Sequence, residues 1–228
     1  DSTSAWITAD SSRSPSNVTD DILFFNSNDA EYANDSWDTT IMSYWSQTTN
    51  PNTTASRSYI PTLMTADVIA LDDLYKGWNY GIKNSFTGNT TYGFNTNIST
   101  TVSTAWGNMT DYLDTSSYTI TDSAGIDTID LSGFTTSQQL DLRAPLKSST
   151  TLIPSTVGDG TETQNLFIAP GTIIENAIGG SGSDDITGNN SANSIKGNAG
   201  NDTLSGGTGS DTLDGGAGND TIVSGSGN

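Results

Sequence analysis

The sequence predicts a mostly β chain that ends in a parallel β-roll, and two observations lead to this prediction. From Gly179 to Asn228 the chain repeats a nine-residue unit without a slip. Each unit carries one large apolar residue: Ile186, Ile195, Leu204, Leu213 and Ile222. Four of the five units place an Asp two residues earlier, at Asp184, Asp202, Asp211 and Asp220, and the remaining unit has Asn193 there. A flexible Gly/Ser-rich linker has no reason to keep these two positions in a fixed phase.

The composition of each unit favours calcium binding. Its first six residues are rich in Gly and end in Asp, and Gly permits backbone conformations in which several carbonyls point at one spot. Calcium takes about six to eight oxygen ligands from carboxylates and carbonyls. The last three residues, as in Thr203–Ser205, form a very short strand with one inward apolar side chain. Two units then make one coil, with calcium between adjacent turns.

This unit resembles the nonapeptide repeat of the RTX calcium-binding proteins. The resemblance implies calcium ligands at Gly180, Gly182, Asp184, Asn198, Gly200, Asp202, Gly207, Gly209, Asp211, Gly216, Gly218 and Asp220. One Leu or Ile per nine residues is a thin core, so metal binding must supply much of the folding free energy.

The composition of the whole chain excludes several classes of function. The 228 residues have a net charge of −19, which argues against nucleic acid or an anionic membrane as a partner and is compatible with a chain that binds cations. The chain contains no Cys, hence no disulfide or thiolate metal site, and no His. It shows no long apolar run and no signal peptide. An extracellular calcium protein without such a signal is expected to be exported through its C-terminus, in the type I manner, unless the chain is incomplete.

The N-terminal part of the chain is loop-like at first and then becomes rich in aromatic residues. Residues 1–20 are polar, Ile22–Phe25 is a strand or part of a helix, and the stretch Ala30–Gln47 holds too many large apolar groups for a surface loop. Within it, Ile41–Trp45 resembles the Met-turn of the serralysin-type metzincin peptidases. By that resemblance Met42 lies beneath the zinc site, and Tyr44 reaches the zinc or the transition-state oxyanion.

A helix is expected next, within Tyr59–Gly77. Leu63, Ala66, Ile69, Ala70, Asp73 and Leu74 fall at helical spacing. In serralysins a helix of this pattern directly follows the Met-turn and ends in a Leu-Tyr-x-Gly segment, which Leu74–Gly77 matches.

Two further segments suggest calcium sites before the repeats. Asp122, Asp127 and Asp130 surround a turn of small residues, which suggests either a hard-cation site or a solvated acidic loop. The resemblance to serralysins supports the cation site and implies ligands at Asp122, Ala124, Gly125 and Asp127, with Ala124 in place of the family's Gly. For the segment Phe86–Asn97 the resemblance implies carbonyl ligands at Phe86, Gly88 and Thr90. The family usually has Arg where this chain has Phe86.

The remaining elements lead into the repeats. Thr128–Phe134 alternates as a strand, Gln139–Leu142 is expected to be the next strand, and Ser148–Gln164 is expected to be a polar insertion loop. Leu166–Ala177 runs directly into the first repeat. By the same resemblance, Glu175 and the carbonyl of Ile173 bind calcium.

One departure from the family is as informative as the matches. Metzincins hold their zinc with the sequence HExxHxxGxxH, and a chain without His cannot supply it. Either the chain is the C-terminal part of a peptidase whose zinc-binding helix lies elsewhere, which we favour because a Met-turn has little reason to persist without zinc, or it is a paralogue that lost catalysis.

We therefore expect residues 1–80 to be the remnant of a metzincin-like α+β catalytic domain, with the Met-turn and one helix. Residues 81–228 are expected to form a calcium domain of β-sandwich-like strands that ends in the β-roll. The expected function is calcium-induced folding and stabilisation of a secreted zinc endopeptidase, with zinc and peptide substrates bound only by the complete enzyme.

Two other functions remain open at this stage. The chain could be an extracellular structural or adhesive calcium module without an enzyme. Finding the zinc-binding sequence within about 60 residues before Met42, the spacing that the resemblance implies, would exclude this hypothesis. It could also belong to a sugar-acting enzyme with attached repeats. The Met-turn and the lack of an evident catalytic carboxylate pair argue against that hypothesis.

Overall fold

The computed structural model describes residues 86–99, 104–146, 152–161 and 163–227. The expected catalytic remnant at residues 1–80, with Met42, Tyr44 and the helix expected within residues 59–77, lies outside the described residues. The boundary between the two expected domains therefore stays a prediction.

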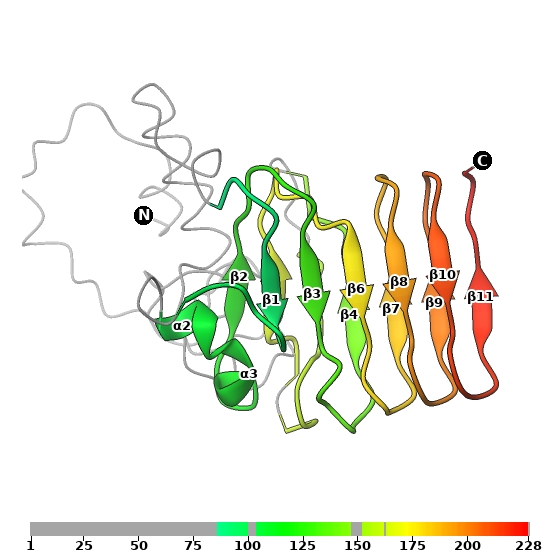
Figure 1. Ribbon diagram of the computed structural model, residues 1–228, viewed down its shortest axis with the longest axis horizontal. Coiled ribbons are helices and arrows are strands. Elements are labelled where there is room, and N and C mark those ends of the chain that lie inside the picture. The colour runs from blue at the N-terminus through cyan, green and yellow to red at the C-terminus, as the bar shows by residue number, and fades with distance from the viewer. Residues whose placement is uncertain (1–85, 100–103, 147–151, 162, 228) are drawn as a thin grey trace, which may run out of the picture.

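The described residues wind into a roll of short parallel strands, each three residues long (Figure 1). One sheet contains, in spatial order, β1 (Thr91–Gly93), β3 (Thr128–Asp130), β6 (Asn176–Ile178), β8 (Ser194–Lys196) and β10 (Thr212–Asp214). The other contains β11 (Thr221–Val223), β9 (Thr203–Ser205), β7 (Asp185–Thr187) and β4 (Gln139–Asp141). A parallel pair, β2 (Tyr118–Ile120) with β5 (Leu166–Ile168), lies at the N-terminal end of the roll.

The strand register confirms that two repeat units make one coil. Ile186 lies beside Leu204, and Ile195 lies beside Leu213, which in each case is two units further along the sequence. Each unit thus gives its strand to one sheet, and the next unit gives its strand to the other. The apolar residue at the strand centre points into the roll, since Ile186, Ile195 and Leu204 are each 0% exposed.

The parallel winding begins well before the repeats. β1 pairs with β3 and β3 with β6, so strands from non-repetitive sequence continue the same sheet. Their central residues Tyr92, Ile129 and Ala177 belong to the same core cluster as the repeat residues. The mostly β fold is confirmed, and its two sheets share one core as in a sandwich, with parallel strands throughout.

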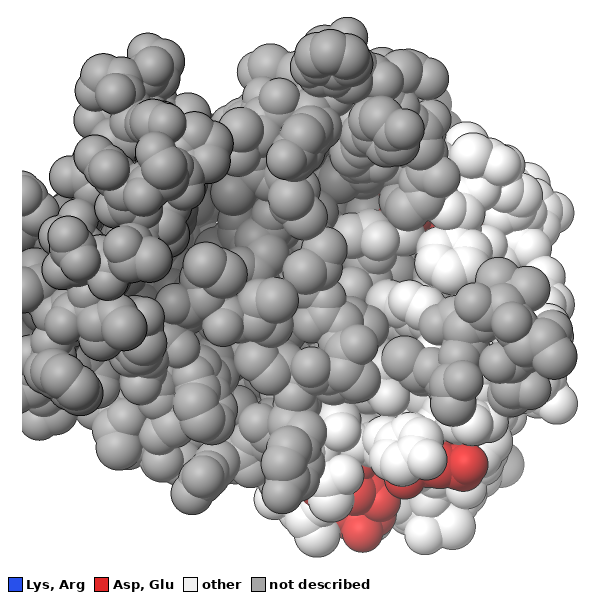
Figure 2. All heavy atoms as spheres, turned by 90° about the vertical axis from the view of Figure 1, so that its left-hand side faces the viewer, with Lys and Arg blue, Asp and Glu red and all other residues white. Residues whose placement is uncertain are grey.

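Two short helices, α2 (Thr104–Gly107) and α3 (Met109–Tyr112), lie near the N-terminal end of the roll (Figure 1). There the core is aromatic: the rings of Tyr92 and Trp106 meet edge to face, with centroids 5.3 Å apart. Of the segment expected to be an insertion loop, Ser155 and Val157 are buried, and the backbone of Ser155 bonds to Leu166. None of the described helices has the length and apolar character needed to cross a membrane. On the face seen in Figure 2, the charged side chains drawn in colour are acidic.

Candidate metal-binding sites

The turns of the roll form two stacks, one at each end of its strands. We call the turns that precede the strands of the larger sheet the first loop stack: residues 86–90, 122–127, 172–175, 188–193 and 206–211. The turns that precede the strands of the smaller sheet form the second loop stack: residues 131–138, 179–184, 197–202 and 215–220. Most of the predicted calcium ligands lie in these two stacks.

The last residue of every turn occupies an equivalent place, directly before a strand. In every turn but the last of each stack, its carbonyl accepts a hydrogen bond from the first strand residue of the next coil, as Asp184 does from Thr203 and Asn193 from Thr212. The side chains of these last residues therefore stand in two columns. The first column is Thr90, Asp127, Glu175, Asn193 and Asp211, and the second is Gln138, Asp184, Asp202 and Asp220.

Carboxylates link neighbouring members of the second column. A carboxylate oxygen of Asp202 accepts the backbone N–H of Asp184 at 2.8 Å, and one of Asp220 accepts the N–H of Asp202 at 3.0 Å. Asp184 likewise accepts the N–H of Gln138 with Oδ1, and its Oδ2 accepts the N–H of Gly180 at 2.7 Å. These bonds hold each carboxylate between two coils.

Two buried oxygens are left without a partner among the described side chains: Oδ2 of Asp202 and Oδ2 of Asp211. A β-carbon added at Gly197 would collide with Asp202 Oδ2 and would lie 2.6 Å from the Gly215 carbonyl oxygen. At Gly206 the added β-carbon would lie 2.5 Å from Asp211 Oδ2 and 2.8 Å from the Ser224 carbonyl oxygen. Each free carboxylate oxygen thus shares a small space with a carbonyl of the following coil, and an unpaired buried carboxylate is costly without a cation.

The N-terminal turns of the first loop stack bring several predicted ligands together. Asp127 Oδ1 accepts the N–H of Thr90 at 2.7 Å, and Glu175 accepts the N–H of Asp127 at 2.8 Å. A β-carbon on Gly125, whose φ is +144°, would lie 2.6 Å from the Gly88 carbonyl oxygen and 2.8 Å from Asp127 Oδ1. Only a residue without a side chain allows this approach, and it places Gly88, Gly125 and Asp127 at one point.

Other predicted ligands of this region have protein partners. The Phe86 carbonyl accepts bonds from the backbone and side chain of Ser123, the Thr90 carbonyl accepts the N–H of Thr128, and Asp122 Oδ2 accepts the Tyr92 hydroxyl at 2.8 Å. The side chain of Ile173 is exposed. A carbonyl oxygen has two lone pairs, so these bonds do not exclude a cation, and the ligand roles stay predictions.

Burial shapes the electrostatics of the acidic groups. It raises the pKa of Asp127 to about 6, and the charges of Asp122 and Glu175 add to the rise, which the Thr90 N–H partly offsets. Burial also raises the pKa of Asp122 and that of Asp184, with smaller opposing effects from their hydrogen bonds. The folded chain alone therefore holds these negative charges at a cost, which a bound cation would relieve.

The oxygens at these sites come from single carboxylates and from the backbone. Within the described ranges, no three acidic side chains gather around one point. In the repeat turns, Gly180 contributes its N–H to Asp184, and Asn198 donates its amide to the Gly179 carbonyl at 2.7 Å.

Sequence reasoning missed Gln138, which begins the second column. Its side chain is buried and bonds to the backbone of Gly158 in both directions, at 2.8 Å each. The signal that could have revealed it is its place immediately before a strand with a central apolar residue, the place that Asp occupies in the repeats.

Comparison with known proteins agrees with this architecture. The family described as "Peptidase M10 serralysin C terminal" matches residues 82–228. The chain is 42% identical over 164 residues to "Metallopeptidase AprA" of Pseudomonas marginalis, covering 71% of this chain and 31% of that protein. It is 40% identical over 157 residues to "Serralysin C" of Dickeya chrysanthemi, covering 69% and 29%, and 38% identical over 160 residues to "Serralysin" of Proteus mirabilis, covering 70% and 29%. The chain thus spans about three tenths of the length of these relatives.

Proposed function

The chain belongs to the serralysin-type M10 peptidase family through its C-terminal domain, and from this premise we propose that it is the calcium-binding C-terminal portion of a secreted zinc endopeptidase. Its work is to fold when calcium is bound and to stabilise the enzyme of which it is a part.

One observation carries the proposal: the unpaired, buried Oδ2 atoms of Asp202 and Asp211. One lies in each loop stack, and each faces a carbonyl oxygen of the next coil. A native fold rarely leaves such a group without a donor or a metal ion. Two oxygens that converge from adjacent coils are what a cation between those coils would bind.

The chemistry of the donors favours calcium over other common metal ions. Zinc prefers thiolate and imidazole ligands, and the chain has neither Cys nor His. Magnesium demands near-ideal octahedral geometry and gives up its water reluctantly, whereas calcium accepts irregular sets of carbonyls and carboxylates. The repeat turns that end in Asp184, Asp202, Asp211 and Asp220 each offer carbonyls together with one carboxylate. These four residues would hold calcium with the carbonyls of their own and adjacent turns.

Calcium would promote folding because, without it, charge repulsion is large compared with the apolar burial in the repeats. The net charge of −19 opposes compaction, and each repeat unit has at most one apolar residue in the core. Metal ions that bridge successive coils remove the repulsion and join the coils at the same time, so their binding free energy becomes folding free energy. Extracellular calcium is high enough for such modest sites, which suits a protein that folds after export.

Peptide hydrolysis belongs to the complete protein in this proposal. Met42 and Tyr44 would lie at its zinc site, as the resemblance implies, and both are outside the described residues. The chain without His has no HExxHxxGxxH sequence, so these residues alone would not hydrolyse peptides.

A calcium titration of the full chain tests the proposal. Far-UV circular dichroism and bound calcium per chain are measured together, starting from protein dialysed against EGTA. We expect the chain to be partly folded in EGTA and to gain β structure cooperatively as calcium binds, with the gain reversed by chelation and not reproduced by magnesium at equal concentration. A β-roll signal that is the same in EGTA and in calcium, or a chain that binds no calcium, would overturn the proposal.

A further inference from the structure

The turn at residues 188–193 differs from its neighbours in how its last side chain is bonded. In the first column, Asp127, Glu175 and Asp211 each accept the backbone N–H of the column member before them. Asn193 instead uses its side-chain oxygen within its own turn, accepting the N–H of Asn189 at 2.8 Å. Asn193 is 2% exposed, so this arrangement is built into the interior.

The amide nitrogen of Asn193 closes the turn against the preceding coil. Nδ2 donates to the Glu175 carbonyl at 3.1 Å and more distantly, at 3.3 Å, to the Ile174 carbonyl and to Asn189 Oδ1. Amide hydrogens thus face the carbonyl oxygens on this side. These hydrogens carry partial positive charge and occupy the space beside the carbonyls, so they repel a cation from that position.

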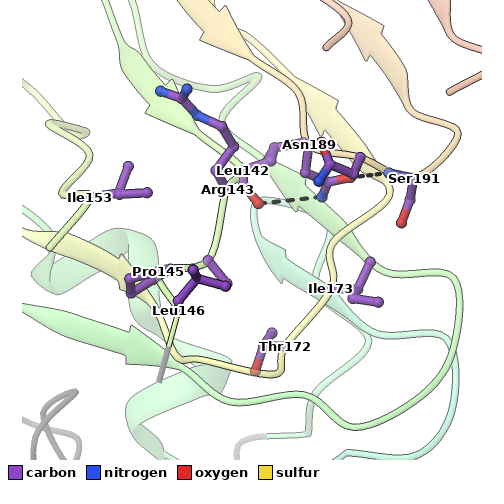
Figure 3. Close-up of a pocket in the computed structure, with 11 residues that line it drawn as sticks. Leu142, Arg143, Pro145, Leu146, Ile153, Thr172, Ile173, Asn189 and Ser191 are labelled. Atoms are coloured by element: carbon purple, nitrogen blue, oxygen red, sulfur yellow. Dashed lines mark hydrogen bonds between the residues drawn. The ribbon is translucent and has the colours of Figure 1, made fainter. Parts of the chain in front are cut away.

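Asn189 reinforces the same closure. Its Nδ2 donates to the Ile174 carbonyl at 2.7 Å and to the Leu142 carbonyl at 3.3 Å, while its Oδ1 accepts the N–H of Ser191 at 2.8 Å. Figure 3 shows Asn189 between Leu142 and Ser191, at the wall of a pocket of about 550 Å³. Two asparagine amides therefore join three segments of chain at this turn.

The opposite side of Asn193 faces the place where other turns present a carboxylate. A β-carbon on Gly188 would lie 2.6 Å from Asn193 Oδ1 and would collide with the Gly206 carbonyl, the same arrangement found at Gly197 and Gly206. There, however, the oxygen belongs to an unpaired carboxylate. At Asn193 the oxygen is neutral and already accepts a hydrogen bond, so this space lacks the negative charge that would hold a divalent cation.

We infer that the turn at residues 188–193 takes no calcium ion and is closed by hydrogen bonds of Asn189 and Asn193. This inference rests on the proposed calcium-binding function. It gives the first loop stack one metal-independent joint, placed between the turn that carries Glu175 and the turn that carries Asp211. The joint needs no metal ion, so the two coils that it connects would come into register with fewer ions than the coils joined by the other turns.

Calcium counting on full-length variants tests the inference. Bound calcium per chain is measured after equilibrium dialysis for the wild type, Asn193→Asp, Asn193→Ala and Asn190→Asp. We expect one more calcium in Asn193→Asp, because the substitution places a carboxylate beside Gly188 and the Gly206 carbonyl. Asn190→Asp adds the same charge at an exposed position of the same turn and should keep the wild-type count. Asn193→Ala should also keep it, with lower stability in EGTA.

The variants Asp202→Asn and Asp211→Asn distinguish failure of this inference from failure of the proposed calcium-binding function. If each loses one calcium while Asn193→Asp gains none, or while Asn193→Ala also loses one, the inference is overturned and calcium binding stands. A wild type that binds no calcium overturns both. A chain in which Asn193→Ala does not fold still leaves Asn193→Asp and Asn190→Asp to decide the outcome.

Discussion

We expect Asp202 and Asp211 each to affect stability in opposite directions with and without calcium. Each carries a buried oxygen that no donor reaches among the described residues. In calcium this oxygen would be a ligand, whereas in EGTA it is an unpaired buried charge. Under the proposed function, the same side chain would therefore stabilise the calcium-bound protein and destabilise the calcium-free protein.

Asp202→Asn should separate these two effects. In EGTA we expect the variant to be more stable than the wild type, because the substitution removes a buried unpaired charge whose cost is about 1–3 kcal/mol or more. In millimolar calcium it should be less stable, because one ion is lost. Urea unfolding in both conditions measures the two changes.

Asp185→Asn is the matched control, since Asp185 is exposed on β7 and carries the same charge. Its effect should be small in both conditions. Equal destabilisation of Asp202→Asn in EGTA and in calcium would show that Asp202 has a packing role only.

Tyr92 supports the acidic turn from inside the core. It is 0% exposed, and its hydroxyl donates to Asp122 Oδ2 at 2.8 Å. Tyr92→Phe keeps the ring contacts but leaves the Asp122 oxygen without its donor, so we expect a loss of about 1–3 kcal/mol in the free energy of unfolding. Tyr112→Phe, at a residue 46% exposed, should change stability little. Unfolding curves that are the same for both variants would contradict the support assigned to Tyr92.

Among the elements, the repeat strands are alike in sequence but unequal in burial. Leu204 on β9 pairs in register with Ile222 on β11, yet Leu204 is 0% exposed and Ile222 is 49% exposed. Leu213 on β10 is partly buried. Among the described residues, Ile222 therefore contributes less buried apolar surface than Leu204.

Leu204→Ala and Ile222→Ala should differ in proportion to this burial. Leu204→Ala creates a cavity in the core, for which we expect a cost of about 2–5 kcal/mol. Ile222→Ala removes a half-exposed side chain and should cost clearly less. Chemical unfolding in saturating calcium measures both, and equal costs would mean that β11 is as well packed as β9.

The elements also show what the sequence could and could not reveal. The nine-residue period predicts β7 to β11 and their pairing because each coil repeats the same Asp, Gly and apolar positions. The strands β1, β3 and β6 continue the same sheet, but segments of different length that carry other helices and strands separate them, so no period is visible there. Their shared feature is a polar residue directly before the strand, as in Thr90, Asp127 and Glu175. That feature gains meaning only when the coils are seen to stack.

Charge is the dominant property of the whole molecule, and calcium and protons should compete to neutralise it. The net charge of −19 includes buried carboxylates, and burial raises the pKa of Asp122, Asp127 and Asp184. In the metal-free chain, a carboxyl whose pKa is higher in the folded state binds its proton more tightly when folded. Such a carboxyl contributes its full stabilisation at pH values below its pKa in the unfolded chain. This contribution is lost as the pH rises through its higher pKa in the folded chain.

The free energy of unfolding should therefore depend on pH in opposite directions in the two conditions. In EGTA, lowering the pH from 7 to about 5 crosses the raised pKa of Asp127, about 6, so the chain should become more stable. In calcium the ion favours the charged carboxylates, so protons displace it and the same change of pH should lower stability. Urea unfolding followed by tryptophan fluorescence measures both slopes.

Two variants locate the origin of the effect. Asp127→Asn should flatten the slope in EGTA, whereas Asp111→Asn, at an exposed residue of α3, should leave it unchanged. A metal-free chain that loses stability as the pH falls from 7 to 5 would show that the carboxylates of the stacked turns are not strained by burial. Calcium would then link the coils without offsetting any cost of burying carboxylates in the folded chain.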